Sequence, residues 1–142
     1  MALAFQVTFD ARDPKRLGAF WAELLGYTDD PPPPGFATWD EALDALGVPE
    51  GERDRAWAVS DPHGVGPRIF LQKVPEVKTA KNRVHLDVNV AAGLPRDRRR
   101  ARVAEEVERA VALGATRVRE VDEPTGYAMV MRDPEGNEFC LQ

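Results

Sequence analysis

The sequence lacks the residues that would tie it to an oxidising compartment or a membrane. It has a single cysteine among 142 residues, which excludes an internal disulfide and fits a reducing compartment. No apolar run approaches the roughly 20 residues that a transmembrane helix needs. The N-terminus has no basic segment leading into a long apolar one, so no signal peptide is expected. These absences predict a cytoplasmic protein without membrane contact.

Positive charge is in short supply as well. Nineteen lysines and arginines stand against 24 acidic residues, and the net charge of -5 argues against a nucleic-acid partner. An acidic surplus would suit a cationic ligand, but it also keeps an ordinary protein in solution. The 43% hydrophobic and 30% charged residues, over this length, predict one globular domain with a real core.

What the chain does contain is a repeated phrase. Asp-Pro-His-Gly at 61–64 and Asp-Pro-Glu-Gly at 133–136 each separate two short, largely apolar runs. The proline pre-sets φ and the glycine can take a positive φ, so each phrase predicts a tight turn within a hairpin. Phe-Leu-Gln at 70–72 then mirrors Cys-Leu-Gln at 140–142. The chain therefore reads as two similar halves.

The first half begins with a predicted strand over residues 3–10, with Phe5 on its inward face. A helix follows, with Asp13 as its N-cap and Gly26 as its C-cap. The prolines at 31–34 must be extended or loop. A short helix over 39–46 is expected on this excursion.

Long excursions in compact domains are often functional. Trp39 and Phe36 are therefore candidate lid residues.

The second half repeats this plan. A strand over 83–90 has Val84 inward and His85 on the other face. A helix over 96–113 ends at Gly114, with Glu106 on its outer side. The last strands are predicted over 116–121 and in the final hairpin.

Each half thus reads as βαβββ, which makes the protein α+β. We expect one domain over 1–142, with module one at 1–74, a linker at 75–82 and module two at 83–142. Two such modules would form a curved mixed sheet with helices outside and an open cup inside, and a concave surface of this kind predicts a ligand site. Overlaying the halves places Gln6 on His85 and Phe70 on Cys140.

Four motifs carry a family likeness: Phe-Trp-Ala-Glu-Leu-Leu-Gly-Tyr at 20–27, His-Leu-Asp-Val at 85–88, Leu-Gly-Ala at 113–115, and Asp-Pro-Glu-Gly-Asn-Glu-Phe at 133–139. Together they resemble the vicinal oxygen chelate superfamily. More narrowly they resemble its glyoxalase-like domains, the group that includes glyoxalase I, bleomycin-resistance proteins and extradiol dioxygenases. The likeness spans essentially the whole chain and indicates the fold, but this fold carries many chemistries.

The resemblance implies a divalent metal in the cup, held by the first and last strands of each half. The first-strand positions fall on Gln6 and His85. The last-strand positions, which usually hold glutamate, fall on Phe70 and Cys140. Phenylalanine cannot ligate, and hard cations prefer carboxylates and water to a thiolate. We therefore predict a degraded metal site with His85 and Gln6 as its candidate ligands, and no other cofactor. A one-residue change of register would substitute Gln72 for Phe70.

The same overlay predicts the lining of the cup, although no catalytic residue can be named. The expected lining residues are Gln6, Thr8, Trp57, Phe70, His85, Asp87, Met129, Met131 and Cys140. Gln6 could serve as a hydrogen-bonding partner of the ligand. Cys140 could be a small buried apolar residue or a thiol activated by His85.

Two small-molecule functions remain open, beside a third reading in which the cup is vestigial and the domain associates with itself or with a partner. The first is a glyoxalase-like small-molecule-binding protein with lyase, isomerase or dioxygenase activity at a degenerate metal site. The alternative is a metal-free binding or sequestering protein of the bleomycin-resistance type, which the missing glutamates favour. A small-molecule ligand is expected in both cases, and the resemblance adds a homodimer.

Overall fold

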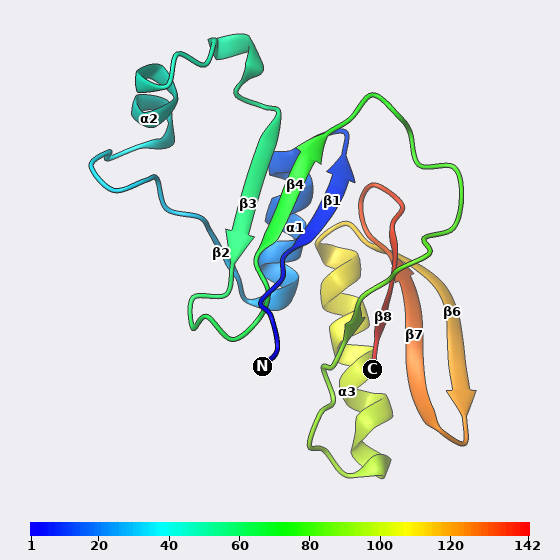
Figure 1. Cartoon of the computed structure of the whole chain (residues 1–142). Helices are drawn as coiled ribbons and strands as arrows, with labels where there is room; N and C mark the ends of the chain where they lie inside the picture. Colours follow the sequence, from blue (N-terminus) through cyan, green and yellow to red (C-terminus); the bar gives the residue numbers. More distant parts are fainter. The chain divides into compact units, whose positions relative to one another are not determined.

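A computed structural model describes all 142 residues and divides them into two compact units, Met1–Val77 and Lys78–Gln142. The division falls inside the predicted linker at 75–82. Each unit holds an open four-stranded mixed sheet and one long helix, so the protein is α+β (Figure 1). None of the helices combines the length and the apolar character needed to cross a lipid bilayer.

The first unit has the strand order β1-β4-β3-β2, with β1 parallel to β4 and the other pairs antiparallel. Helix α1 covers one face, where Val59, Ile69 and Leu71 are buried (Figure 1). Its elements are β1 (Val7–Ala11), α1 (Pro14–Leu25), β2 (Thr28–Asp29), α2 (Trp39–Ala45), the 3₁₀ turn η1 (Glu50–Glu52), β3 (Ala56–Ser60) and β4 (Ile69–Lys73).

The second unit repeats this connectivity with the strand order β5-β8-β7-β6. Helix α3 covers the face where Met131, Phe139 and Leu141 are fully buried. Its elements are β5 (Asp87–Val88), α3 (Arg96–Ala112), β6 (Thr116–Glu123), β7 (Gly126–Arg132) and β8 (Glu138–Leu141). The predicted βαβββ order is therefore present twice.

The caps of α1 confirm the start and stop read from the sequence. The Asp13 carboxylate accepts a hydrogen bond from the Arg16 backbone N–H at 3.1 Å, and Pro14 occupies the first helical position. Gly26 takes φ +73° at the C-terminal end, in the left-handed region that glycine tolerates best.

Strand pairing shows that the two halves are equivalent residue by residue. Thr8 lies opposite Phe70 in the parallel pair of the first sheet, and Asp87 lies opposite Cys140 in that of the second. Across the neighbouring antiparallel pair, Ala58 lies opposite Phe70 just as Val130 lies opposite Cys140. Phe70 and Cys140 therefore occupy the same place in the two sheets.

A pair of side-chain hydrogen bonds fixes the same register. The Gln72 amide donates to the Asp10 carboxylate at 2.8 Å, and the Gln142 amide donates to the Asn89 carbonyl oxygen at 3.0 Å. Because Gln72 corresponds to Gln142, it cannot take the place of Phe70. The register alternative is excluded.

Both Asp-Pro-x-Gly hairpins form, and their aspartates contribute more than the sequence suggested. Asp133 is 3% exposed, and its carboxylate accepts from the backbone N–H groups of Glu135 and Asn137 at 2.9 Å each. Asp61 likewise accepts from three backbone N–H groups of its own turn. Gly136 has φ +89°, as predicted for the turn.

The predicted first strands are too long. β1 begins only at Val7, and Phe5 is 72% exposed instead of facing inward. β5 comprises only Asp87 and Val88, and Val84 is 81% exposed. Apolar and polar residues keep alternating along these segments, but the parallel partner strands end. A longer β1 would have to pair with the loop before Ile69.

Glu106 also differs from expectation. The helical pattern predicts this side chain on the outer side of α3, yet the residue is only 6% exposed. Arg102 and Arg109 each reach its carboxylate at 2.8 Å, from the turns before and after it. The two guanidinium groups compensate its charge and cover it from solvent.

Candidate functional site

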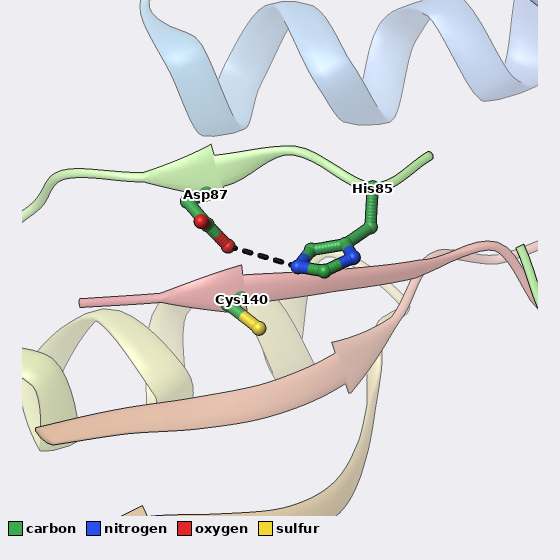
Figure 2. A group of neighbouring side chains, drawn as sticks. All are labelled: His85, Asp87 and Cys140. Atoms are coloured by element: carbon green, nitrogen blue, oxygen red, sulfur yellow. Dashed lines mark ion pairs between the residues drawn. The ribbon is translucent and has the colours of Figure 1, made fainter. Parts of the chain in front are cut away.

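The open face of the second sheet gathers three of the predicted lining residues. β5 and β8 run in parallel, which sets Asp87 directly beside Cys140. His85 precedes Asp87 by two residues, and its Nε2 atom lies 3.2 Å from the Asp87 Oδ1 atom (Figure 2). The ligand atoms of all three side chains lie within 4.8 Å of one another. We call these residues the His85 cluster.

The local environment keeps the Cys140 thiol protonated. Burial raises its pKa, and the negative charge of Asp87 and a hydrogen bond to that carboxylate raise it further. His85 and Asp87 are much more open, with side chains 41% and 48% exposed. A protonated thiol is a poor nucleophile, so this arrangement disfavours activation of Cys140 by His85.

A cavity of about 600 Å³ adjoins the His85 cluster. Its volume lies within the usual range for small-molecule sites, roughly 300–1,000 Å³. The lining mixes apolar strand residues with charged ones: Val118, Val121, Ala128 and Val130 with Lys78, Lys81, Arg119, Arg132, Glu135 and Glu138.

Glu138, at this cavity, binds two residues of the segment before β5. Its carboxylate accepts from the Asn82 backbone N–H at 3.0 Å and pairs with the Lys78 ammonium group at 3.0 Å. Burial alone would raise the pKa of Glu138, but these bonds outweigh burial and lower the pKa to about 2. The residue is ionised throughout the physiological range.

In the first unit, Gln6 is already engaged by an arginine. Its Oε1 atom accepts from the Arg68 Nη1 group at 3.0 Å. The Arg68 Nε group pairs with Asp30 at 2.6 Å, and its guanidinium carbon lies 5.5 Å from the centre of the Phe70 ring. The two positions at which the family resemblance expects ligands in this half, Gln6 and Phe70, therefore both contact Arg68.

A second cavity, of about 340 Å³, is lined by the open face of the first sheet and by the excursion. Trp39 is part of its lining, and the indole N–H of this residue donates to the Asp30 backbone carbonyl at 2.8 Å. Phe36 does not contribute to the lining. The remaining lining residues are Leu43, Val48, Glu52, Arg53, Arg55, Ala56, Trp57, Ala58, Arg68 and Phe70.

Three predicted lining residues belong mainly to the helix-covered faces. Met129 lies opposite Leu141 and Met131 lies opposite Phe139, and directly opposed residues share a face of the sheet. Met131 and both partners are fully buried.

Trp57 borders the smaller cavity, but it lies opposite the buried Leu71. Its ring packs so closely on α1 that a Cβ atom at Gly18 would come within 2.7 Å of it. Thr8, opposite Phe70, is exposed and lines neither cavity.

Sequence comparison identifies the family. A family model described as "Glyoxalase-like domain" matches residues 6–142. The chain belongs to the glyoxalase-like domain family. No sequence among curated proteins matches it.

Solved structures of the same fold cover nearly all of this glyoxalase-like domain. One is a glyoxalase/bleomycin resistance protein/dioxygenase family enzyme from Burkholderia phytofirmans PsJN, with 17% identity, TM-score 0.63, and coverage of 96% of this chain and 94% of that one. The fosfomycin resistance protein FosX from Mesorhizobium loti has 13% identity, TM-score 0.64, and coverage of 100% and 91%.

A mutant of FosX from Listeria monocytogenes, complexed with Mn(II) and 1S,2S-dihydroxypropylphosphonic acid, has 14% identity, TM-score 0.63, and coverage of 100% and 90%. Identities this low establish a shared fold and nothing finer.

The residues of this glyoxalase-like domain fit one kind of cation better than another. An imidazole, a carboxylate and a cysteine that loses its proton on binding are donors that Zn²⁺ and similar borderline ions accept. A hard, oxygen-preferring ion finds a single carboxylate in the His85 cluster.

The sequence reading did not identify Asp87 as a possible metal ligand. It lies two residues after His85 and therefore on the same face of the strand, and it lies opposite Cys140. The spacing from His85 was the signal available in the sequence.

Proposed function

We propose that this glyoxalase-like domain binds a small molecule on the open face of its second sheet, in the cavity beside the His85 cluster. One observation carries the proposal: His85 and Cys140 line a cavity of about 600 Å³ that also has apolar walls, and their donor atoms lie within 4.8 Å of each other and of the Asp87 carboxylate. A hollow with apolar walls and a few convergent polar groups is typical of ligand sites, and this cavity adds charged residues to that pattern.

The chemistry of the chain's own residues suits a ligand with oxygen atoms. The imidazole of His85 can donate to such an atom or take up a proton from it, and Asp87 orients the ring at 3.2 Å. A borderline cation bound at the His85 cluster would add Lewis-acid polarisation of the ligand oxygens. This supports a lyase, isomerase or dioxygenase type of activity as the first candidate.

A metal-free binding or sequestering protein is the second candidate. The first half favours it, because the two expected ligand positions hold Gln6 and Phe70, and neither is a carboxylate. Arg68 also engages Gln6 and lies over the Phe70 ring. The FosX relative complexed with Mn(II) supports the first candidate only through its fold.

Titration calorimetry with Zn²⁺, Ni²⁺ and Mn²⁺ separates the candidates. We expect Zn²⁺ to bind more tightly than Mn²⁺, and His85→Ala to weaken Zn²⁺ binding by about tenfold or more. His63→Ala is the matched control, since His63 lies in the first hairpin turn.

A thermal-shift panel of oxygen-rich and aromatic compounds completes the test. Ligand binding without any cation binding supports the metal-free candidate. A protein that binds neither cations nor compounds contradicts the proposal as a whole.

A cytoplasmic homodimer is part of the same proposal. The single cysteine supports the compartment, and the family resemblance supports the dimer.

A further inference from the structure

In the first unit, an arginine stands where the equivalent part of the second unit carries the His85 cluster. Phe70 is equivalent to Cys140, as the strand registers show, and Thr8 to Asp87. Gln6 precedes Thr8 by two residues, as His85 precedes Asp87. None of these three side chains of the first unit is ionisable, so the charged groups beside them are Arg68, which contacts Gln6 and Phe70, and its ion-pair partner Asp30.

The guanidinium group is held in place with donors to spare. Its Nε group pairs with Asp30 at 2.6 Å and its Nη1 group donates to Gln6 at 3.0 Å. Its Nη2 group donates to no protein atom, and the side chain is 40% exposed. Arginine offers five N–H donors in a planar fork, so a pre-oriented edge remains available to an anion.

Arg68 also lines the smaller cavity, whose walls are mainly apolar. Trp39, Leu43 and Val48 come from the excursion, and Ala58 and Phe70 come from the sheet. At about 340 Å³ the cavity is near the lower end of the range for ligand sites, which favours a compact molecule.

Arg68 supplies the unused cationic donors of this cavity. Three arginines and two carboxylates line it, but Arg53 is paired with Asp40 and Asp44, and Arg55 is paired with Glu52. The carboxylate of Asp30 is already engaged by Arg68 at 2.6 Å and by the Ser60 hydroxyl at 2.5 Å. A cationic ligand would meet the arginines without an unengaged acceptor near Arg68.

We propose that the first unit binds a compact aromatic anion, such as an aromatic carboxylate, with its ring against Trp39 and Phe70 and its charge on Arg68. This inference builds on the proposed small-molecule function by naming a ligand class, but it requires neither a metal nor His85. It also differs from what the overall net charge of -5 would suggest, because it rests on the unused donors of one arginine.

Three probes of one shape and different charge test the proposal on the wild-type chain. These are 2-naphthoate, the neutral 2-naphthamide and the cationic 2-naphthylmethylamine. We expect 2-naphthoate to bind at least tenfold more tightly than either of the others in titration calorimetry, because a charge-assisted hydrogen bond is lost in both. Its binding should also shift the Trp39 indole N–H resonance in NMR spectra. Equal affinities, or no binding of 2-naphthoate at millimolar concentration, overturn the proposal.

Variants assign the effect to one side chain. Arg68→Gln should remove the preference for 2-naphthoate, and Arg68→Lys should keep part of it because the charge stays while the fork is lost. Arg98→Gln, which removes an exposed arginine of the second unit, should change nothing. An Arg68→Gln chain that is folded by circular dichroism and retains the full preference contradicts the assignment.

His85→Ala separates this inference from the proposed function. Cation binding should fall in that variant while 2-naphthoate binding stays unchanged. Loss of 2-naphthoate binding in His85→Ala would place the anion in the second unit and overturn the inference.

Discussion

Individual neighbours determine the chemistry of the open faces. Burial raises the pKa of the Cys140 thiol, Asp87 raises it further, and the same carboxylate lies 3.2 Å from the His85 Nε2 atom. In the other unit, Arg68 engages the amide of Gln6, which would otherwise be a free acceptor. The residue type at a family position therefore predicts the chemistry of that position less well than the neighbouring side chain does.

Removing the charge of Asp87 should make the thiol more acidic. Burial and Asp87 both raise the pKa of Cys140, so Asp87→Asn removes one of two causes and lowers that pKa towards its usual value. The rate of alkylation by iodoacetamide should therefore rise at a lower pH than in the wild type. Cys140 is the single cysteine, so the alkylation signal is unambiguous. An unchanged pH midpoint would contradict the role of Asp87, and Asp97→Asn on α3 is the control.

Glu138 should make the fold sensitive to acid. Its pKa is about 2 in the folded protein and about 4.5 when unperturbed, so its contribution to stability is present above pH 4.5 and is lost as pH falls towards 2. Glu138→Gln should flatten the free energy of unfolding over that window by about 1–2 kcal/mol, allowing for solvent screening. Denaturant titrations at several pH values check this. Equal slopes in both proteins would show that the bonds from Asn82 and Lys78 contribute nothing.

At the scale of elements, the close contact between α1 and its sheet depends on a glycine. Gly18 of α1 faces the ring of Trp57 and the side chain of Leu71. The close approach explains why Trp57 can lie on the helix-covered face despite its size. The turns are stabilised differently, by an aspartate whose carboxylate accepts hydrogen bonds from backbone N–H groups.

Gly18→Ala should destabilise the first unit although alanine favours helix. The new Cβ atom would lie 2.7 Å from Trp57 and 3.2 Å from Leu71, so the ring must move. Overpacking of this kind costs about 1–3 kcal/mol, which exceeds the gain of about 1 kcal/mol in helix propensity. Denaturant unfolding measures the difference. Gly51→Ala is the matched control because nothing lies within 4 Å of its added Cβ atom, and equal stabilities of the two variants would refute the close packing.

Asp133→Ala should weaken the second hairpin. The substitution leaves the N–H groups of Glu135 and Asn137 without their acceptor in a largely buried turn. We expect a loss of about 2–3 kcal/mol in the free energy of unfolding. Asp61→Ala should cost less, since its turn is more exposed. A larger loss for Asp61→Ala would reverse this reasoning.

At the scale of the whole molecule, the internal repeat was the most informative signal in the sequence. It predicted the βαβββ order, both hairpins and the equivalence of Phe70 with Cys140, because turn chemistry and caps are local. The faces of Trp57, Met129 and Met131 could not be predicted in the same way. The runs at 56–59 and 127–131 are apolar on both sides, so no polar row fixes their phase.

The ends of the strands could not be predicted from the sequence either. A strand ends where its partner ends, and alternation along residues 3–6 or 83–86 carries no information about the partner. The engagement of Gln6 by Arg68 is a contact over 62 residues that no local pattern encodes.

The resemblance also predicts the size of the assembly. A chain of 15.8 kDa that forms a homodimer should show about twice that mass in light scattering after size-exclusion chromatography. The mass should stay constant on dilution through the micromolar range if the dimer is stable. A mass equal to one chain at every concentration would refute the homodimer.

The duplicated amide contacts, Gln72 with Asp10 and Gln142 with Asn89, lie one pleat away from Phe70 and Cys140. The register of each parallel pair is thus held by residues that line neither cavity. Evolution, or a protein engineer, can therefore exchange Phe70 or Cys140 for a carboxylate and reprogram the reactive surface while the scaffold keeps its alignment.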